Sequence, residues 1–421
     1  MMTQERYEAY IRLLKNELVP AMGCTEPISI AYAVALTRSI LGEEPASGRL
    51  AVSANIVKNA KSVTVPQTGG LKGLAAAFAA GLFGDAKKEL EVLSVIREED
   101  LPALKRTAEE FPLEITVPDG CDIFDITVTL LSERHTARVR IMRDHTNVVL
   151  KERDGEVLFS AAAEAEETTR DKQELNVRDI VTFADTVELS RVLPILQRQV
   201  ECNMAIAEEG LRGNWGAGIG QVLLRIFAPD IRVTAKAYAA AGSDARMNGC
   251  DMPVVINSGS GNQGIACSVP VVVYARGMKV PDEKMYRALC VSNLITLRLK
   301  AGIGTLSAYC GAVSAGAGAG CGVAYLQGGG YEEIAHTLVN AVAIDSGIIC
   351  DGAKASCAAK IATAVEAGLL GFAMYQSGKE FFGGDGIVKK GVEATIDSVS
   401  RLADRGMRET DREIIRIMLE E

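Results

Sequence analysis

The feature that most constrains the fold is a change of hydrophobic period part-way along the chain. Segments 125–132, 135–142 and 147–151 alternate apolar and polar residues, which is typical of half-buried antiparallel strands joined by short turns. On either side, apolar residues recur at helical spacing instead. Because one element cannot follow both periods, the sequence predicts a small antiparallel meander set into a mainly helical protein.

The expected fold class is therefore α+β, with a large mainly helical domain and an inserted small α/β domain. Strand character begins in segments 91–95 and 113–117, and a polar run at 161–172 is expected to be a linker. The domain boundaries that follow are 1–85 and 173–421 for the helical catalytic domain and 86–172 for the small domain with its linker. Ala-rich stretches and 41 Gly among 421 residues suit helices that approach one another closely.

Helical patterns continue on both sides of the meander. They lie at 5–42, 71–83, 177–208, 216–228, 284–301, 331–345, 354–376 and 386–420. Asp385, which precedes the last of these, is expected to cap that helix.

Charge and composition exclude several classes of protein. Lys plus Arg is 45 and Asp plus Glu is 54, and the net charge of −9 argues against nucleic acid or an anionic membrane as partner. No uninterrupted run of about 20 apolar residues suggests a membrane span. A secretion signal is also absent from the first residues, so we expect a cytoplasmic protein whose ten Cys stay reduced. Since there are only three His, its chemistry is expected to depend on sulfur.

Cys350 and Cys357 lie seven residues apart, close to an expected helix start. Thiolates are soft ligands that suit zinc or iron–sulfur clusters, and a turn before the helix could bring both onto one metal. The spacing alone fits equally well two buried cysteines that act as small hydrophobes. Cys321, in a Gly/Ala stretch further upstream, is expected to serve close packing or to be a spare ligand.

Cys24 lies just before another expected helix, in Met22-Gly-Cys-Thr-Glu-Pro27, with Pro27 suited to the first turn. A helix N-terminus lowers the pKa of a thiol, which makes Cys24 a candidate nucleophile or base. The alternative is a packed cysteine beside a turn.

The loop 257–264, Asn-Ser-Gly-Ser-Gly-Asn-Gln-Gly, formally contains a Gly-x-Gly-x-x-Gly pattern. A dinucleotide site also needs a helix directly after it, and Pro270 is expected to disturb that helix. Backbone N–H groups at a helix start could instead bind an anion such as a substrate carboxylate. An ordinary Gly-rich connection is the other interpretation.

Four segments together resemble the L-cysteine desulfidase family, which is related to the iron–sulfur L-serine dehydratases. They are 22–27, 55–70, 257–264 and 346–357. The resemblance covers nearly the whole chain. It implies cleavage of L-cysteine to pyruvate, ammonia and sulfide, without pyridoxal phosphate, by a [4Fe–4S] cluster that three cysteines hold.

For individual residues, the resemblance makes Cys24 the proton acceptor. The three cluster ligands that it implies are Cys310, Cys350 and Cys357. Cys321 and Cys290 are the other candidates for the third ligand. The iron left open would bind the substrate sulfur as a Lewis acid.

Polar side chains are expected to orient the substrate carboxylate. The candidates are Ser258, Ser260, Asn262, Gln263, Gln67, Thr68 and Lys58.

Two alternatives stay open. One is the same elimination from L-serine or another β-substituted amino acid. The other is a non-catalytic protein that binds an amino acid or a metal. A homodimer is expected from base rates for an enzyme of this size.

Overall fold

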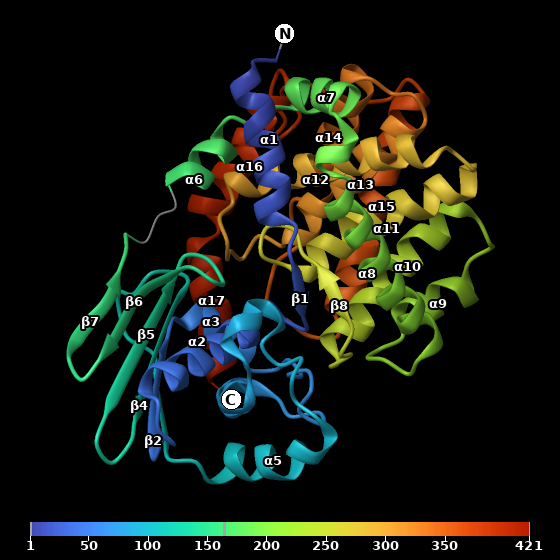
Figure 1. Ribbon diagram of the computed structural model, residues 1–421. Coiled ribbons are helices and arrows are strands. Elements are labelled where there is room, and N and C mark those ends of the chain that lie inside the picture. Colours follow the sequence, from blue (N-terminus) through green and yellow to red (C-terminus); the bar gives the residue numbers. More distant parts are fainter. Residues whose placement is uncertain (1, 163–165, 421) are drawn as a thin grey trace.

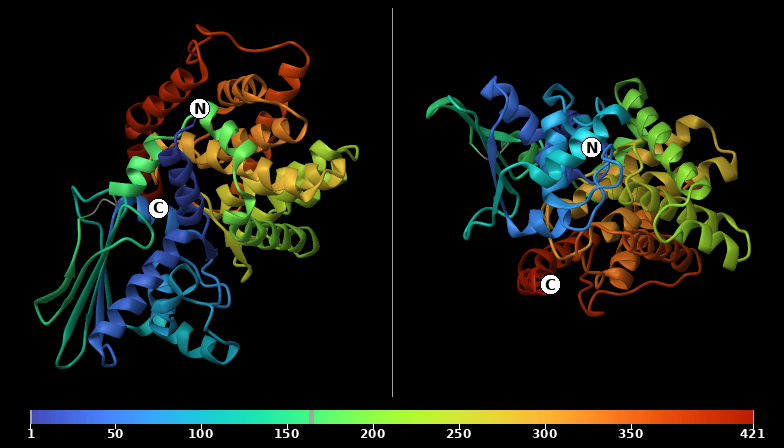
Figure 2. Two further views of the ribbon diagram at one scale, coloured as in Figure 1. Left: turned by 45° about the horizontal axis from the view of Figure 1, so that its top comes forward. Right: turned by 90° about the horizontal axis from the view of Figure 1, so that it is seen from below.

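The structure, a computed structural model, describes residues 2–162 and 166–420. A mixed sheet lies beside a larger body of helices (Figure 1). The views in Figure 2 show the sheet at one side of the molecule. The predicted α+β, mainly helical fold class is confirmed.

Six described strands form this sheet in the order β3-β2-β4-β5-β6-β7. They are β2 (Ser47–Val52), β3 (Leu113–Thr116), β4 (Asp125–Leu131), β5 (Thr136–Met142), β6 (Val148–Arg153) and β7 (Glu156–Ser160). β2 and β3 run parallel, and the other neighbouring strands run antiparallel. The three alternating segments form β4, β5 and β6, so the predicted meander is confirmed. Its buried side chains pack against α2 (Thr25–Leu41).

Segment 91–95, predicted as a strand, forms turns that follow a 3₁₀ helix, Ala86–Glu91. Val92 and Leu93 are buried there, so burial in turns rather than strand pairing accounts for their apolar character. β2 comes from the N-terminal piece of the chain, and the domain boundaries stay a prediction. The other helices of this half are α1 (Gln4–Glu17), α3 (Ala54–Ala60), α4 (Gly73–Phe83) and α5 (Leu101–Glu110).

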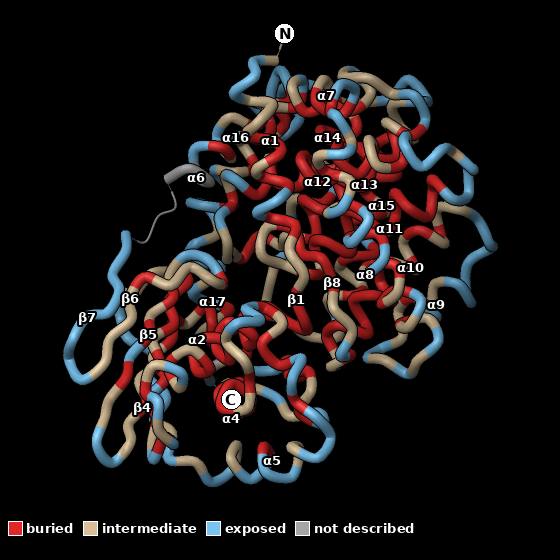
Figure 3. The backbone as a smooth tube through the Cα atoms, in the orientation of Figure 1, coloured by how far each residue is buried: buried red, intermediate tan, exposed pale blue. Residues whose placement is uncertain are grey.

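Buried residues occur both in the helical body and where α2 packs against the sheet (Figure 3). The first helices of the helical body are α6 (Glu166–Gln173), α7 (Val177–Thr186), α8 (Leu193–Arg212), α9 (Ile219–Ile226), α10 (Ile231–Met247) and α11 (Gly261–Met278). They are followed by α12 (Asp282–Ala301), α13 (Gly311–Leu326), α14 (Tyr331–Asp345), α15 (Cys357–Gln376), α16 (Val392–Arg401) and α17 (Arg408–Leu419).

Several predictions for this half are corrected. α10 occupies a segment with no predicted helix, and α11 runs through Pro270 without ending. The lost hydrogen bond costs about 3 kcal/mol, which burial of α11 against α10 and α13 outweighs. Asp385 caps no helix, because α16 begins only at Val392. The predicted linker 161–172 is partly α6, and its residues 163–165 lie outside the described residues.

A second, two-stranded sheet brings together the segment that carries Cys24 and the loop 257–264. β1 (Pro20–Met22) pairs antiparallel with β8 (Pro253–Val255). The turn after β1 carries Cys24, and β8 leads into the loop 257–264. This pairing brings two segments more than 200 residues apart in sequence to one place.

α15 is the one described helix long and apolar enough, by length and composition, to cross a membrane. Of its apolar window, 56% is buried inside the fold, against α10, α13 and α14. Its composition is that of a core helix.

Candidate active site

Cys310 and Cys350 stand on neighbouring extended segments. Cys310 immediately precedes α13, and Cys350 lies in the loop before α15. An antiparallel bridge pairs Tyr309 with Ile349, and the Cys350 N–H donates to the Ala308 carbonyl at 2.6 Å. Side chains alternate along extended backbone, so both thiols leave the bridge on the face opposite Tyr309.

Cys357 joins them because two helices start at the same place. It is the first residue of α15, whose backbone touches that of α13. A Cβ on Gly368 would lie only 2.1 Å from the Gly316 carbonyl oxygen, and one on Gly320 would lie 2.3 Å from the Gly368 carbonyl oxygen. The predicted close approach of Gly/Ala-rich helices is confirmed at this contact.

The fourth thiol of the site, that of Cys24, comes from the N-terminal part of the chain. Cys24 lies directly before α2, as predicted, at the N-cap position but without a capping hydrogen bond to its side chain, which is buried. The Cys24 thiol donates to Glu26 Oε2 across 3.0 Å. The Thr25 hydroxyl donates to the Gly259 carbonyl at 2.8 Å, which fixes the start of α2 against the loop 257–264.

The predicted lowering of the Cys24 pKa is wrong. Burial raises the pKa of the Cys24 thiol well above its ordinary value, and the Glu26 carboxylate raises it further, while the Arg246 charge acts in the opposite direction. Burial also acts to raise the pKa of Glu26, but the His145 imidazole and the Cys24 thiol outweigh it and lower that pKa to about 2. The pair is therefore a thiol that donates to a carboxylate.

These groups line one cavity of about 110 Å³. The predicted residues that it brings together are Cys24, Cys310, Cys350, Cys357, Ser260, Asn262 and Gln263. Cys321 and Cys290, the other candidates for the third ligand, do not line it. Both lie fully buried inside helices, where burial raises the thiol pKa, that of Cys290 to about 12. Of the three candidates for the third ligand, Cys310, Cys321 and Cys290, only Cys310 lines the cavity.

Four predicted substrate residues lie outside this cavity. Ser258 lines a neighbouring one. Gln67 uses its backbone N–H to bind Asp251, at 2.8 Å. The Thr68 hydroxyl donates to the Val65 carbonyl at 2.7 Å, so it stabilises a turn.

Lys58, the fourth, pairs with the C-terminal helix instead. Its buried ammonium lies 2.5 Å from Asp411 Oδ1 in α17, and Lys61 donates to the Met418 carbonyl at 2.6 Å. The Lys58 backbone also supports the loop that carries Cys350, since a Cβ on Gly352 would lie 2.3 Å from the Lys58 carbonyl oxygen. Lys58 therefore supports the loop of Cys350 and pairs with α17, and it does not line the cavity.

Sequence reasoning missed Arg246, which also lines the cavity. Its side chain is 2% exposed, and neither Nε nor Nη2 has a hydrogen-bond partner among the described residues. A Cβ on Gly261, at the start of α11, would lie 2.3 Å from Arg246 Nε, so the missing side chain leaves room for the guanidinium. The Glu26 carboxylate lines the same cavity and acts on the Arg246 charge, but neither Nε nor Nη2 donates a hydrogen bond to it. Buried N–H groups of a cation that lack a partner are the expected mark of an anion site. The one sequence signal was an arginine among Ala and Gly residues at 235–247.

Other polar atoms around the cavity are similarly unpaired. Asn262 Oδ1 and Gln263 Oε1 are buried and have no partner in the described part of the chain. Lys300 donates to the Gly304 carbonyl at 2.7 Å, and burial lowers its pKa to about 8, while nearby Cys350 and Cys310 act to raise it. The cavity therefore offers donors for an anion and acceptors for an ammonium group.

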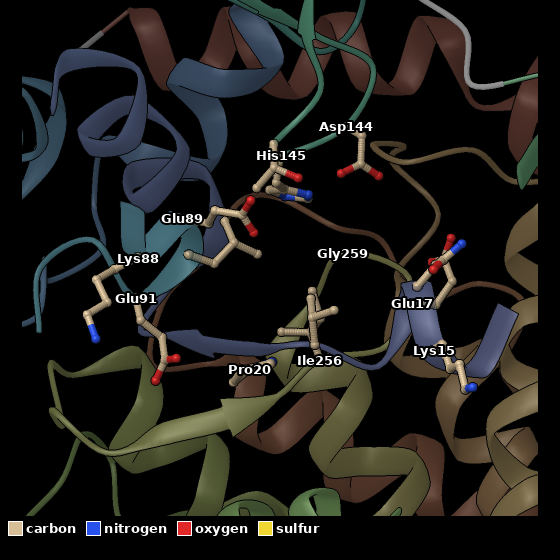
Figure 4. A pocket seen from close by; sticks show the side chains of 14 residues that line it. Lys15, Glu17, Pro20, Lys88, Glu89, Glu91, Asp144, His145, Ile256 and Gly259 are labelled. Carbon is tan, nitrogen blue, oxygen red and sulfur yellow. The ribbon is translucent and has the colours of Figure 1, made fainter. Parts of the chain in front are cut away.

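A second cavity adjoins this one, and a third adjoins the second. The second, of about 190 Å³, shares Lys300 and Thr305 with the first and shares Glu17 and Asp144 with the third cavity of about 420 Å³. Figure 4 shows this third cavity, which we call the outer cavity, with His145 and Asp144 on one side of it and Glu17 and Lys15 on another.

The donor set fits an iron–sulfur cluster. Three thiols from two helix starts and one loop line the same wall, and thiolates are the usual ligands of such clusters. Among residues 2–162 and 166–420, no three Cys, His, Asp or Glu side chains form a group suited to one metal ion. Cluster ligands bind different irons and therefore stand further apart than the ligands of a single ion.

Comparison with known proteins agrees with this chemistry. A family model described as the serine dehydratase alpha chain matches residues 87–416. The UPF0597 protein of Desulfitobacterium hafniense (strain Y51) is 52% identical, over 100% of this chain and 98% of that one. The UPF0597 protein of Lachnoclostridium phytofermentans is 49% identical over 98% and 100%. That of Treponema denticola is 44% identical over 99% of each chain. The chain therefore belongs to the serine dehydratase alpha chain family, whose chemistry is that of iron–sulfur lyases of the dehydratase type.

Proposed function

We propose that this protein eliminates sulfide from L-cysteine to give pyruvate and ammonia. The observation that carries the proposal is the meeting of Cys24, Cys310, Cys350 and Cys357 around one cavity with the unpaired Arg246. Such a site needs reduced thiols, which suits action in the cytoplasm. Association as a homodimer stays a prediction.

Cys310, Cys350 and Cys357 would hold a [4Fe–4S] cluster. Bound there, the cluster would supply a Lewis acid for the departing sulfur.

Arg246 is the proposed partner of the substrate carboxylate. A guanidinium binds a carboxylate through two parallel hydrogen bonds, and its free Nε and Nη2 are available for them. The N-terminus of α11, where Ser260 precedes Gly261, adds backbone N–H groups and the positive end of a helix dipole. Asn262 Oδ1 and Gln263 Oε1 would accept hydrogen bonds from the substrate ammonium group.

Cys24 is the proposed base. Transfer of its proton to Glu26, 3.0 Å away, leaves a thiolate that the N-terminus of α2 and the Arg246 charge both stabilise. The thiolate takes the α-proton, the electron pair of that bond forms the Cα–Cβ double bond, and the Cβ–S bond breaks to release sulfide. The aminoacrylate that remains takes up water and yields pyruvate and ammonia.

One feature favours cysteine as substrate. Apolar side chains, Met247 and Ala353 among them, surround Cys24 and Cys357. A buried hydroxyl needs a hydrogen-bond partner, whereas a thiol tolerates an apolar wall. L-Serine is the second candidate substrate, because the family model is that of a serine dehydratase.

The test begins with protein purified without oxygen and reconstituted with iron and sulfide. We expect about four irons per chain, loss of iron in Cys357→Ser, and release of pyruvate and sulfide from L-cysteine. Cys121→Ser is the matched control, because Cys121 lies near β4 and lines none of the three cavities. Release of pyruvate from L-serine alone would select the second candidate. Protein that binds no iron after reconstitution would refute the proposal.

A further inference from the structure

His145 is a buried histidine that the proposed elimination has not used. It lies in the turn between β5 and β6, and its side chain is 2% exposed. Neither Nδ1 nor Nε2 has a hydrogen-bond partner among the described residues, which is unusual for a buried imidazole.

The fold holds this ring in place. The ring of Phe124 packs edge-on against it, with centroids 4.8 Å apart. On another side a Cβ at Gly259 would lie 2.6 Å from the imidazole, so the absence of a side chain makes room for the ring. The Ser29 hydroxyl in α2 donates to the His145 carbonyl at 2.8 Å. His145 is thus fixed to the helix that Cys24 caps.

Glu26 stands between His145 and Cys24. Its Oε2 lies 3.0 Å from the Cys24 thiol, and its Oε1 lies 3.8 Å from His145 Nε2. The first contact is a hydrogen bond, and the second lies slightly beyond hydrogen-bond length, so that a rotation of the Glu26 carboxylate toward the fixed ring would close it. The two oxygens of one carboxylate therefore face a thiol and an imidazole.

The imidazole lies beyond Glu26, outside the cavity that the thiols line. Glu26 lines that inner cavity, whereas His145 lines the outer cavity of about 420 Å³ (Figure 4). Glu17, Asp144 and Glu89 line the same outer cavity, and carboxylates there can accept a proton from an imidazolium. Water in a cavity of this size can carry the proton further.

We propose that Glu26 and His145 form a relay that carries a proton from Cys24 to the outer cavity. The inference rests on the proposed function, because it supplies the step that returns Glu26 to a carboxylate, ready to accept the proton of the Cys24 thiol again. Once Cys24 has taken the α-proton it is again a thiol, and Glu26 still carries the proton that it accepted from Cys24. Glu26 passes that proton to His145 Nε2, and His145 releases one from Nδ1 to the outer cavity. No electrons move, and one proton leaves the buried site for each substrate deprotonated.

The relay has a readout that needs no elimination. L-Alanine carries an α-proton but no leaving group, so cluster-loaded enzyme in D₂O should exchange that proton for deuterium, a change that NMR detects. Exchange requires Cys24 to trade its proton with solvent, which is the task given to the relay. We expect His145→Ala to slow both this exchange and the turnover of L-cysteine by about 100-fold, with KM nearly unchanged.

Imidazole added to His145→Ala should restore at least a tenth of the lost rate, because the vacated space adjoins the outer cavity. Glu26→Gln keeps the shape of the carboxylate and should slow exchange without rescue. His135→Gln is the matched control. His135 precedes β5 in the same meander, is paired with Asp154 at 2.7 Å, lines none of the three cavities and should leave both rates unchanged. Iron content and the unfolding midpoint are measured for every variant.

Two results would overturn the relay. One is exchange at the wild-type rate in either His145→Ala or Glu26→Gln. The other is a loss in His145→Ala that imidazole leaves unchanged although iron content and unfolding midpoint match the wild type. A wild-type protein that binds iron but neither eliminates nor exchanges refutes the proposed function itself, and the relay with it.

Discussion

The close contact between α13 and α15 leads to a prediction about how helix packing affects the stability of the protein and the geometry of its site. Gly368→Ala places a methyl group 2.1 Å from the Gly316 carbonyl oxygen. An ordinary contact there begins at 3.4 Å, so the two backbones must part by about 1.3 Å, the difference between these distances. No rotamer change relieves the clash, because both partners belong to the backbone.

The size of the effect follows from two opposing contributions. Overpacking a well-packed core costs about 1–3 kcal/mol, and a clash between backbones belongs at the upper end. Alanine also favours a helix over glycine by about 1 kcal/mol. We therefore expect Gly368→Ala to lower the free energy of unfolding by about 2 kcal/mol.

The same displacement should reach the site. Cys310 and Cys357 stand at the starts of the two helices, and a shift of about 1 Å in catalytic groups can cost about 100-fold in rate. Iron retained after reconstitution should fall together with turnover of L-cysteine.

Denaturant unfolding and iron analysis check both effects. Gly347→Ala is the matched control, since no atom lies within 4 Å of its Cβ position and it lies near Cys350. Equal stability of Gly368→Ala and wild type, or a gain of about 1 kcal/mol as helix propensity alone predicts, would refute the reasoning.

Three further predictions concern single side chains. Cys310→Ser should abolish iron binding, whereas Cys321→Ala should retain iron and lose only about 1 kcal/mol of stability, as iron analysis and denaturant unfolding would show. Arg246→Lys keeps the charge but loses the bidentate fork, so KM for L-cysteine should rise about 10- to 100-fold in steady-state assays, and an unchanged KM would contradict the assignment. Burial raises the pKa of Asp345 to about 6, so the native state keeps that proton longer than the unfolded state and stability falls as pH rises from about 4 to about 6. Asp345→Asn should therefore match the wild type near pH 4 and exceed it by up to about 3 kcal/mol at pH 7.5 in unfolding experiments.

Local sequence rules predicted those parts of the fold that depend on interactions between residues close together in sequence. The alternation of β4 to β6, and Cys24 before a helix with Pro27 in its first turn, each depend on neighbours within a few residues. Pro270 shows the limit of such rules. Its local penalty is real, but burial of the whole of α11 exceeds it.

The candidate site was predictable where a residue type already signals its chemistry. Cysteines near helix starts could be found in this way, but Arg246 could not, because its importance comes from the crossing of α10 and the start of α11. The predicted direction of the Cys24 pKa shift was wrong for a related reason. Helix position predicts a lower pKa, whereas burial and a carboxylate two residues away decide the direction.

The ion pair between Lys58 and Asp411 has a consequence for the order in which the parts of the site are synthesised. The loop that carries Cys350 is supported by Lys58, whose ammonium in turn pairs with α17. Because α17 follows every cysteine of the site in sequence, the thiols are made before the segment that supports their loop. A variant without α17 would keep all these thiols but lose the support for the loop of Cys350.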